Sequence, residues 1–586
     1  CLTEKGAFMF MRNAIVLAAA SSLAATVLLY QPRQASACGC FTPPDPSVPI
    51  VQAGERIVFG MQGGLVTSHI QIQYQGPAAE FGWLLPLPSQ PEPLELGTEE
   101  LFAQLLATTQ PKYVARPEYV GNCLFDPNRN GGFNSPASDS GGAEGDPNDD
   151  GGSPLVLQDS VGPFDYAILR ADSKQPMLDW LAENRFFVPA GTDAAVDPYI
   201  RSGAFFLALK LRKGNEVGDI TPVVVKYRSD LPMIPLVLTS VAANPNMGVA
   251  VWVLGEHRAI PRNFNHTRIN DAKINWLGFG DNYVDVITDA VDDAEGGRSF
   301  VTEYAGTSAV MQNLLDYDWR FGQLAELRQL TNAQDYIQYL VNYGYGVQSN
   351  QPPNFSYQFS SAMLAMLQRE LPVPAGLLAA GVTPNDYYSQ IYYYLGWYRE
   401  QNPELYADLD LEFDPVALTA EIDERVVQPT LAAGKLFKDF PYLTRMFTTL
   451  DPREMTRDPV FSFNPDLPEV SNEHFGRLIY YCNKIGGNAD PGTTPARLIT
   501  EDGWSMSFPY GTDGNRWAGV DMPGSRYTEI LREEGPPEIV RDRTDEIRDS
   551  LGQSGAMGCR SSDAGGGLLA LLGLALIVVS RRTRRA

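Results

Sequence analysis

The sequence predicts an α+β protein with a β-rich N-terminal half and a mainly helical C-terminal half. The chain has 586 residues, of which 44% are hydrophobic and 20% charged, so it has enough apolar side chains for large folded cores. Segments with two-residue alternation outnumber helical segments up to about residue 310, and helical periodicity dominates beyond it. Separate strand-rich and helix-rich regions are typical of α+β proteins rather than doubly wound sheets.

Changes in composition divide the chain into seven segments. They are upstream residues and a signal peptide (1–37), a β-rich first part of a domain (38–122), a Gly/Asp/Asn-rich linker (123–157), the α+β remainder of that domain (158–310), a mainly helical region (311–532), a charged linker (533–557) and a C-terminal sorting signal (558–586). This division indicates one folded body between two targeting segments.

The first elements are strands. Alternation predicts strands at Ile57–Phe59 and 67–74, and Gly63-Gly64 between them supplies the positive φ values of a hairpin turn. A third strand is expected over 80–85, ending at Pro86, because proline cannot donate a ladder hydrogen bond.

A helix over Glu99–Ala107 follows, with Thr98 as its N-cap and acidic residues in its first turn. The same reasoning predicts further strands at 164–169, 204–209, 221–227, 236–241 and 249–254, and a helix at 175–184. Helices are predicted within 311–340, 387–398, 416–431 and 474–484.

The N-terminus has the layout of a secretory signal peptide. Arg12 precedes an apolar run over 14–30, and Ala35-Ser36-Ala37 precedes Cys38, so cleavage is expected after Ala37. A membrane anchor is the alternative reading of the apolar run, and acylation of Cys38 as a lipoprotein is a weaker one. We therefore expect export.

The C-terminus carries a second signal. Gly558 and Cys559 precede a short apolar segment over 565–580 and an arginine cluster, which the positive-inside rule places in the cytoplasm. Sixteen helical residues span about 24 Å, short of a ~30 Å hydrocarbon core. The tail resembles the MYXO-CTERM type of surface-sorting signal of myxobacterial envelope proteins, which implies processing near Cys559; a plain tail anchor is the alternative.

The charge excludes one class of partner. The formal net charge is −25, and the body over 38–559 carries −31 because the two ends contribute +2 and +4. Phosphate backbones need clustered Lys and Arg, so we expect no nucleic-acid binding. The expected partners are the export and sorting machinery, the membrane through the C-terminal tail before or instead of processing, and a surface glycan or protein.

The cysteines suggest disulfides. Without Cys1 and Cys559, four remain: Cys38, Cys40, Cys123 and Cys482. An even number in an exported chain favours two disulfides, and we expect one of the first two cysteines to pair with Cys123. Cys38 and Cys40 are too close for an unstrained mutual bridge.

Two stretches of the linker have the oxygen spacing that opens a calcium loop. Their candidate ligands are Asp126, Asn128 and Asn130 in the first and Asp146, Asn148 and Asp150 in the second. The twelfth loop position, which should be Glu, is Ala137 or Leu157. Calcium is therefore the weaker reading beside a solvated low-complexity loop, and no other cofactor is expected.

No catalytic residue is assigned. The four histidines do not form a zinc motif, and we interpret His69 as a packed strand residue. His474 and Cys482 are eight residues apart and could share a helix face as a Cys–His nucleophile, but a disulfide at Cys482 is the stronger interpretation. The acidic run Asp285–Glu295 and the tyrosine run Tyr387–Tyr398 are read as a solvated helix surface and as core packing, with an acid/base pair and glycan stacking as the alternatives.

Several short sequence segments resemble the bacterial domain of unknown function 2330. They are Gly54–Phe59, Ile70–Gly76, Phe81–Pro88, Val161–Asp165 and Phe300–Gly306, with Pro459–Pro468 familiar from longer members. The resemblance covers most of residues 38–310 and implies an exported envelope protein without naming any catalytic residue.

The sequence thus predicts an exported protein of the cell surface or outer envelope with a non-enzymatic binding or structural role. The alternative is an exported hydrolase with an unrecognised carboxylate or metal site. The absence of a recognisable nucleophile or ligand set favours the first, although a novel fold can hide a site from motif reading.

Overall fold

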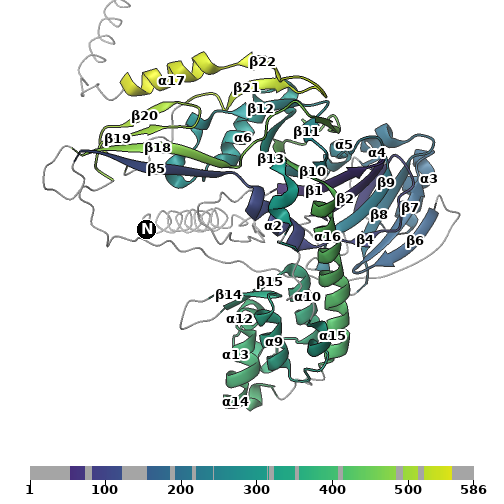
Figure 1. The fold of residues 1–586 in the computed structure, drawn as a ribbon. Coiled ribbons are helices and arrows are strands. Elements are labelled where there is room, and N and C mark those ends of the chain that lie inside the picture. The colour runs from purple at the N-terminus through teal and green to yellow at the C-terminus, as the bar shows by residue number, and fades with distance from the viewer. Residues whose placement is uncertain are drawn as a thin grey trace, which may run out of the picture. The chain divides into compact units, whose positions relative to one another are not determined.

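The structure is a computed structural model. It describes residues 53–72, 82–121, 155–184, 186, 192–213, 219–241, 243–312, 314–315, 323–349, 356–406, 413–482, 492–512 and 521–556. These residues form an α+β fold built on one large sheet, as the sequence predicts (Figure 1).

The central sheet has ten strands in the order β22-β21-β12-β13-β16-β10-β1-β2-β9-β4. The strands are β1 (Ala53–Gln62), β2 (Leu65–Ile72), β4 (Glu95–Leu96), β9 (Val223–Arg228), β10 (Met247–Gly255), β12 (Asn265–Ile269), β13 (Ser299–Thr307), β16 (Tyr442–Leu450), β21 (Ser525–Ile530) and β22 (Glu538–Asp542). β1 is antiparallel to β2 and parallel to β10, so segments far apart in sequence meet at the centre of the sheet.

Both faces of the central sheet are covered. Along β1, Ile57 and Phe59 belong to one hydrophobic core and Val58 to another, because successive side chains point to opposite faces. β10 is buried over Gly248–Gly255, and its run of apolar residues has no alternation for the same reason.

One face packs against a second sheet with the order β3-β8-β7-β6. Its strands are β3 (Gly82–Leu87), β6 (Leu155–Val161), β7 (Phe164–Arg170) and β8 (Phe205–Leu211). The short elements around it are α3 (Lys174–Glu183), α4 (Thr192–Ala195), η2 (Asp197–Tyr199) and α5 (Leu236–Thr239). Leu207 of β8 faces the central sheet, whereas its neighbour Phe206 packs with Trp180 of α3. The second sheet is therefore a layer between the central sheet and α3.

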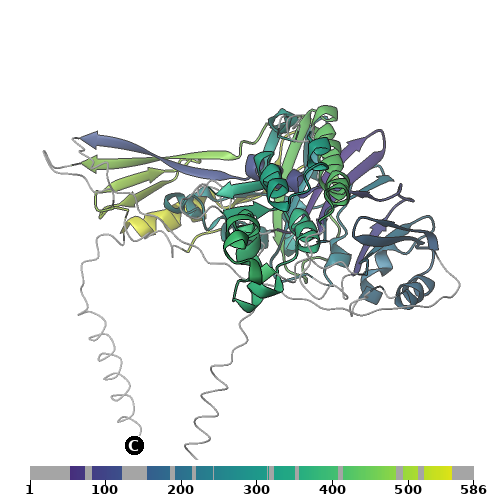
Figure 2. The ribbon, with the colours of Figure 1, turned by 90° about the horizontal axis from the view of Figure 1, so that it is seen from below.

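The other face contacts helices and a third sheet with the order β20-β19-β18-β5. Its strands are β5 (Lys112–Gly121), β18 (Glu473–Cys482), β19 (Ala496–Ile499) and β20 (Ser505–Phe508), and β5 runs parallel beside β18 (Figure 2). The helices are α2 (Glu99–Thr109), α6 (Tyr283–Asp292), α16 (Gln428–Asp439) and α17 (Thr544–Ala556). Phe102 of α2 packs edge-on against Trp252 of β10 in this core.

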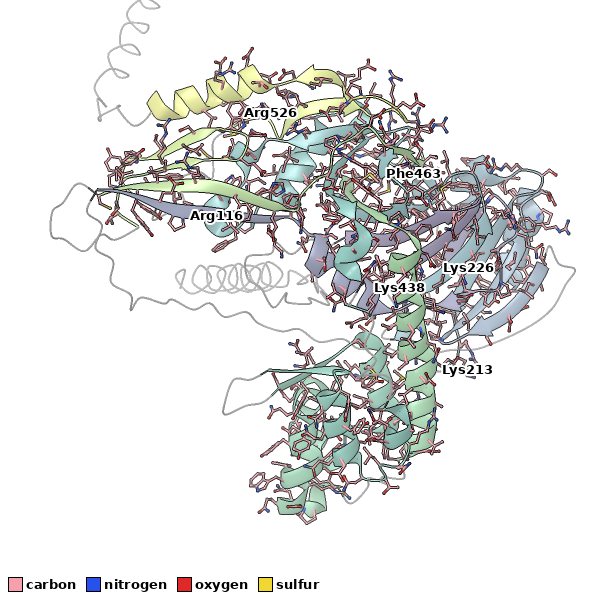
Figure 3. All side chains as sticks on the ribbon, viewed as in Figure 1. Arg116, Lys213, Lys226, Lys438, Phe463 and Arg526 are labelled. Atoms are coloured by element: carbon pink, nitrogen blue, oxygen red, sulfur yellow. The ribbon has the colours of Figure 1, made fainter. Side chains whose placement is uncertain are left out.

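Helices with their own core occupy most of residues 324–427. They are α8 (Leu324–Leu327), α9 (Ala333–Asn342), α10 (Ser361–Glu370), α11 (Ala375–Ala379), α12 (Pro384–Ser389), α13 (Ile391–Tyr393), α14 (Arg399–Gln401) and α15 (Pro415–Ile422), with π-turns η8 (Tyr394–Tyr398) and η10 (Asp423–Val427). The hairpin β14 (Gly346–Ser349) and β15 (Ser356–Phe359) belongs here, and β11 (Arg258–Pro261) pairs with β17 (Phe461–Asn464), which carries the labelled Phe463 in Figure 3. After α16 the chain returns to strands.

Most predicted elements are confirmed. The strands at 57–59, 67–74, 164–169, 204–209, 221–227 and 249–254 are β1, β2, β7, β8, β9 and β10. Gly63 and Gly64 have φ values of 59° and 74°, as the hairpin turn requires, and the Thr98 side chain accepts a hydrogen bond from Glu100 N–H at the start of α2.

Three predictions were wrong. The helix predicted over 474–484 is wrong for its described part, since His474–Cys482 lie in β18, where apolar and polar side chains do not alternate regularly. The predicted strand at 236–241 is the helix α5, whose run of apolar residues does not distinguish the two structures. β3 also continues through Pro86 to Leu87 instead of ending at that proline.

The targeting segments, the apolar C-terminal run and the Gly/Asp/Asn-rich stretch over 126–154 lie outside the described residues. Each helix of the described part of the chain is too short or too polar to cross a bilayer. The segment 533–557, expected as a charged linker, contains β22 and α17, and β22 pairs with β21 of the central sheet.

Candidate functional site

A cavity of about 300 Å³ is lined by residues of the central sheet, the second sheet and the segments that follow β9 and β16. Most of the lining is apolar, including Phe59, Leu85 and Leu87. Its volume is at the lower end of the ~300–1,000 Å³ that small-molecule sites occupy. The cavity can hold one small ligand.

Strand register decides which side chains line the cavity. Glu55, Ile57 and Phe59 share one face of β1 because they are two residues apart. On β2, Ser68 is paired with Phe59 and Ile70 with Ile57, so these four residues lie on the same face. The cavity therefore lies over a mostly apolar patch that carries one carboxyl group, that of Glu55, near the start of β1.

Glu55 is the most unusual residue of this patch. Its Oε2 atom is buried and has no hydrogen-bond donor within the described part of the chain. Burial, with a smaller contribution from the charge of Asp458, raises the pKa of Glu55 to about 7. This carboxyl group therefore exchanges its proton near neutral pH.

Asp458 brings a second carboxyl group to the cavity from the segment between β16 and β17. Its Oδ1 atom accepts a hydrogen bond from the backbone N–H of Val237 at 2.9 Å, and its carbonyl oxygen accepts one from Asn263 Nδ2 at 2.7 Å. Burial raises the pKa of Asp458, partly offset by the Val237 N–H and the Tyr199 hydroxyl. These bonds fix the position of the carboxyl group.

Two tyrosines add hydroxyl groups to the polar part of the lining, which also includes Ser68, Ser229 and the exposed Arg201. Burial and the nearby Asp458 raise the pKa of Tyr199 well above its usual range, so its hydroxyl stays protonated. Burial also raises the pKa of Tyr227 on β9 to about 12. The cavity thus combines two carboxyl groups of raised pKa with neutral hydroxyls in a mostly apolar wall, an arrangement that can bind a cation or transfer a proton.

A second polar cluster lies on the opposite face of the central sheet. Arg445 of β16 and Glu303 of β13 are completely buried, with Nε and Oε2 2.5 Å apart. The Tyr283 hydroxyl donates to Glu303 Oε1 at 2.7 Å, and the Arg445 guanidinium lies 5.2 Å from the centre of the Trp252 ring. This cluster lies within the core that joins α2, α6 and the sheet, which suits a structural role.

The structure separates His474 from Cys482. Both lie on β18, and eight residues of extended chain span about 26 Å, so they cannot act as a nucleophile pair. Cys482 is disulfide-bonded, and the cysteine it pairs with lies outside the described residues. His474 Nδ1 instead lies 2.7 Å from Glu501 Oε2, and its ring stacks on Tyr113.

The other histidines are not arranged as ligands. Burial and the nearby Lys226, labelled in Figure 3, lower the pKa of His69 on β2 to about 4. His266 is buried between Glu529 and Thr302, each 3.0 Å from a ring nitrogen. Within the described residues, no group of three or more His, Cys, Asp or Glu side chains is placed to hold a metal ion.

The acidic run follows α6 and the loop after it. Asp285 is exposed, Asp289 pairs with Lys273, and Asp293 pairs with Arg543 at 2.9 Å. In the tyrosine run, Tyr387 and neighbouring side chains are buried in the helical core, whereas Tyr393 is partly exposed. Asp285, Asp289 and Asp292 thus have the surface positions favoured from the sequence, whereas core packing holds for Tyr387 and Tyr388 and the other four tyrosines of the run are half-buried or exposed.

The remaining residues singled out from the sequence lie outside the described residues. They are Cys38, Cys40 and Cys123, the calcium candidates Asp126, Asn128, Asn130, Asp146, Asn148 and Asp150, and the processing positions Ala37, Gly558 and Cys559. Their roles stay predictions.

The sequence analysis missed both carboxyl groups of the cavity. Glu55 left a detectable signal, because it occupies the same alternation phase as Ile57 and Phe59, where a buried strand should carry an apolar residue. Asp458 left none. It lies in a loop, and only the fold brings it to the face of β1.

The architecture defines an α+β protein with a cavity between strands and loops. The chain belongs to the family of uncharacterised proteins conserved in bacteria called DUF2330, whose model matches residues 32–358, more than half of the sequence. No curated protein and no solved structure matches the chain. The family match includes Glu55 and Tyr199 and excludes Asp458.

Proposed function

We propose that this protein is an exported cell-envelope protein with a non-enzymatic binding role, and that the cavity beside Glu55 and Asp458 is its ligand site. The observation that carries the proposal is a cavity with a mostly apolar lining and two convergent carboxyl groups. Such a combination of apolar walls and few polar groups is typical of small-molecule sites.

Export is inferred from the sequence. The leader ending at Ala37 and the tail beginning at Gly558 support passage through the membrane and retention at the cell surface. Contact with the membrane through the tail and capture of a surface glycan or protein belong to the same proposal. The acidic body favours small cationic ligands over anionic ones.

The binding role is tested by filling the cavity. In the full-length protein, Ala204→Leu adds a bulky side chain at a residue that lines the cavity, and Ala103→Leu on α2 is a matched control away from it. We expect small ligands from a chemical library to raise the melting temperature of the wild type and the control, with at least fivefold weaker binding to Ala204→Leu. Equal binding to all three proteins would exclude the cavity as the site.

The second candidate is an exported hydrolase that uses the two carboxyl groups as acid and base. It is favoured by the pKa of Glu55, which is raised to about 7, where a general acid or base works best at neutral pH. Peptides, glycans and phosphoesters, with and without divalent metal, are the substrates to test. Turnover that disappears in Glu55→Gln would replace the binding role with this one.

A further inference from the structure

We propose that the ligand of the cavity is a small primary amine, whose ammonium group binds between Glu55 and Asp458 while its apolar body packs against Phe59, Leu85 and Leu87. This inference rests on the proposed binding function and adds the chemical class of the ligand. Within the described residues, the fold leaves the carboxyl oxygen Oε2 of Glu55 without a hydrogen-bond donor.

The carboxyl oxygens match an ammonium group. Glu55 Oε2 is buried without a donor in the described part of the chain, and Asp458 Oδ1 already accepts the Val237 N–H. An ammonium group brings three donors and no acceptor, so it can satisfy Glu55 and the remaining capacity of Asp458 together. A neutral hydroxyl brings only one donor.

Electrostatics favours the same ligand. Burial and the nearby charge of Asp458 raise the pKa of Glu55 to about 7, so below that pH Glu55 mostly holds a proton when the cavity has no cation. A bound ammonium replaces that proton: the amine keeps its own proton, Glu55 becomes a carboxylate, and one proton leaves to the solvent. Charge is balanced on both sides of this exchange.

The lining disfavours other cations. Calcium takes six to eight oxygen ligands, whereas the cavity offers two carboxyl groups and a few hydroxyls among apolar side chains. Arg201 is the one cationic side chain of the described lining, and it is exposed, so water screens its repulsion. A bare metal ion gains nothing from the apolar side chains of Phe59, Leu85 and Leu87. An alkyl or aryl group can pack against them.

Isothermal titration of the full-length protein with matched probes tests this inference. The probes are phenethylammonium and hexylammonium, each compared with the alcohol of the same skeleton. We expect the ammonium probes to bind at least tenfold more tightly than the alcohols. Glu55→Gln should remove this preference, and Glu256→Gln, an exposed acid in the turn after β10, should keep it.

The protons released on binding provide a readout that needs no variant. At pH 6.5 Glu55 is mostly protonated, so an ammonium probe should release a substantial fraction of a proton, measured from the dependence of the heat on the buffer. At pH 9 the release from Glu55 should vanish. Equal binding of amines and alcohols would overturn the amine assignment and leave a binding cavity, whereas no binding of either class would overturn the proposed function as well.

Discussion

At the scale of single residues, the most demanding feature is the completely buried pair of Arg445 and Glu303. Removing two charges from water costs several kcal/mol per ion, and the pair persists because its partners are also buried. Tyr283 donates to the carboxylate, and Thr109 accepts from Arg445 Nη1 at 3.4 Å. The cluster therefore depends on several elements that are distant in sequence.

Breaking the buried pair should destabilise the protein strongly. Arg445→Met leaves the Glu303 carboxylate buried without its cation, and we expect a loss of about 3–5 kcal/mol in the free energy of unfolding. The matched control is Arg477→Met, which removes an exposed pair with Glu118 at 2.7 Å and should cost less than about 1 kcal/mol. Urea unfolding of both variants measures the difference, and equal losses would contradict the structural role of the pair.

At the scale of elements, the β1–β2 hairpin shows how local sequence determines backbone geometry. Gly63 and Gly64 both have positive φ, which gives the turn a twist that suits the flanking strands. Apart from the glycine itself and its two chain neighbours, a Cβ atom at either position would meet no atom within 4 Å. The requirement for glycine is therefore a property of the backbone alone.

Substitution at this turn should reveal that backbone cost. Gly64→Ala forces an alanine into the left-handed region and should destabilise the protein by about 1–2 kcal/mol, because Cβ then crowds the following carbonyl oxygen. Gly64→Asn should cost less, because asparagine tolerates this region better than alanine. The urea midpoints of the two variants check the order, and a more stable alanine variant would contradict it.

In the whole molecule, the candidate ligand site depends on how the central sheet packs against the second sheet. The central sheet has cores on both faces, and the cavity lies in the face that packs against the second sheet. Glu55, Tyr199 and Asp458 converge there from segments separated by up to about four hundred residues. No local segment of the chain contains this site.

The mature protein should be shorter than the sequence at both ends. On the proposed export route the leader and the sorting tail are removed, so we expect its first residue to be Cys38 and its last to lie near Cys559. Peptide mapping of protein purified from the cell-envelope fraction measures both ends. A cytoplasmic protein with an intact leader and its terminal arginines would contradict the proposed localisation.

The predicted elements differ in how well the sequence revealed them. β2 and α2 were predictable, since alternation and an N-cap are local signals. β18 was not, because its mixed residues are sorted into buried and exposed only when one face of its sheet packs against the core, where Leu478 and Tyr480 are buried. In the candidate site, Glu55 could have been identified from its position in the strand pattern, whereas Asp458 could not be identified from the sequence.

The local geometry of turns and caps, the α+β class, the family and the acidic charge of the body could all be predicted from the sequence. That Glu55 and Asp458 share one cavity, and that His474 and Cys482 lie far apart, became visible only in the folded protein. The physical reason is that turns, caps and alternation depend on neighbouring residues, whereas burial and the pKa shifts it causes depend on packing between distant segments.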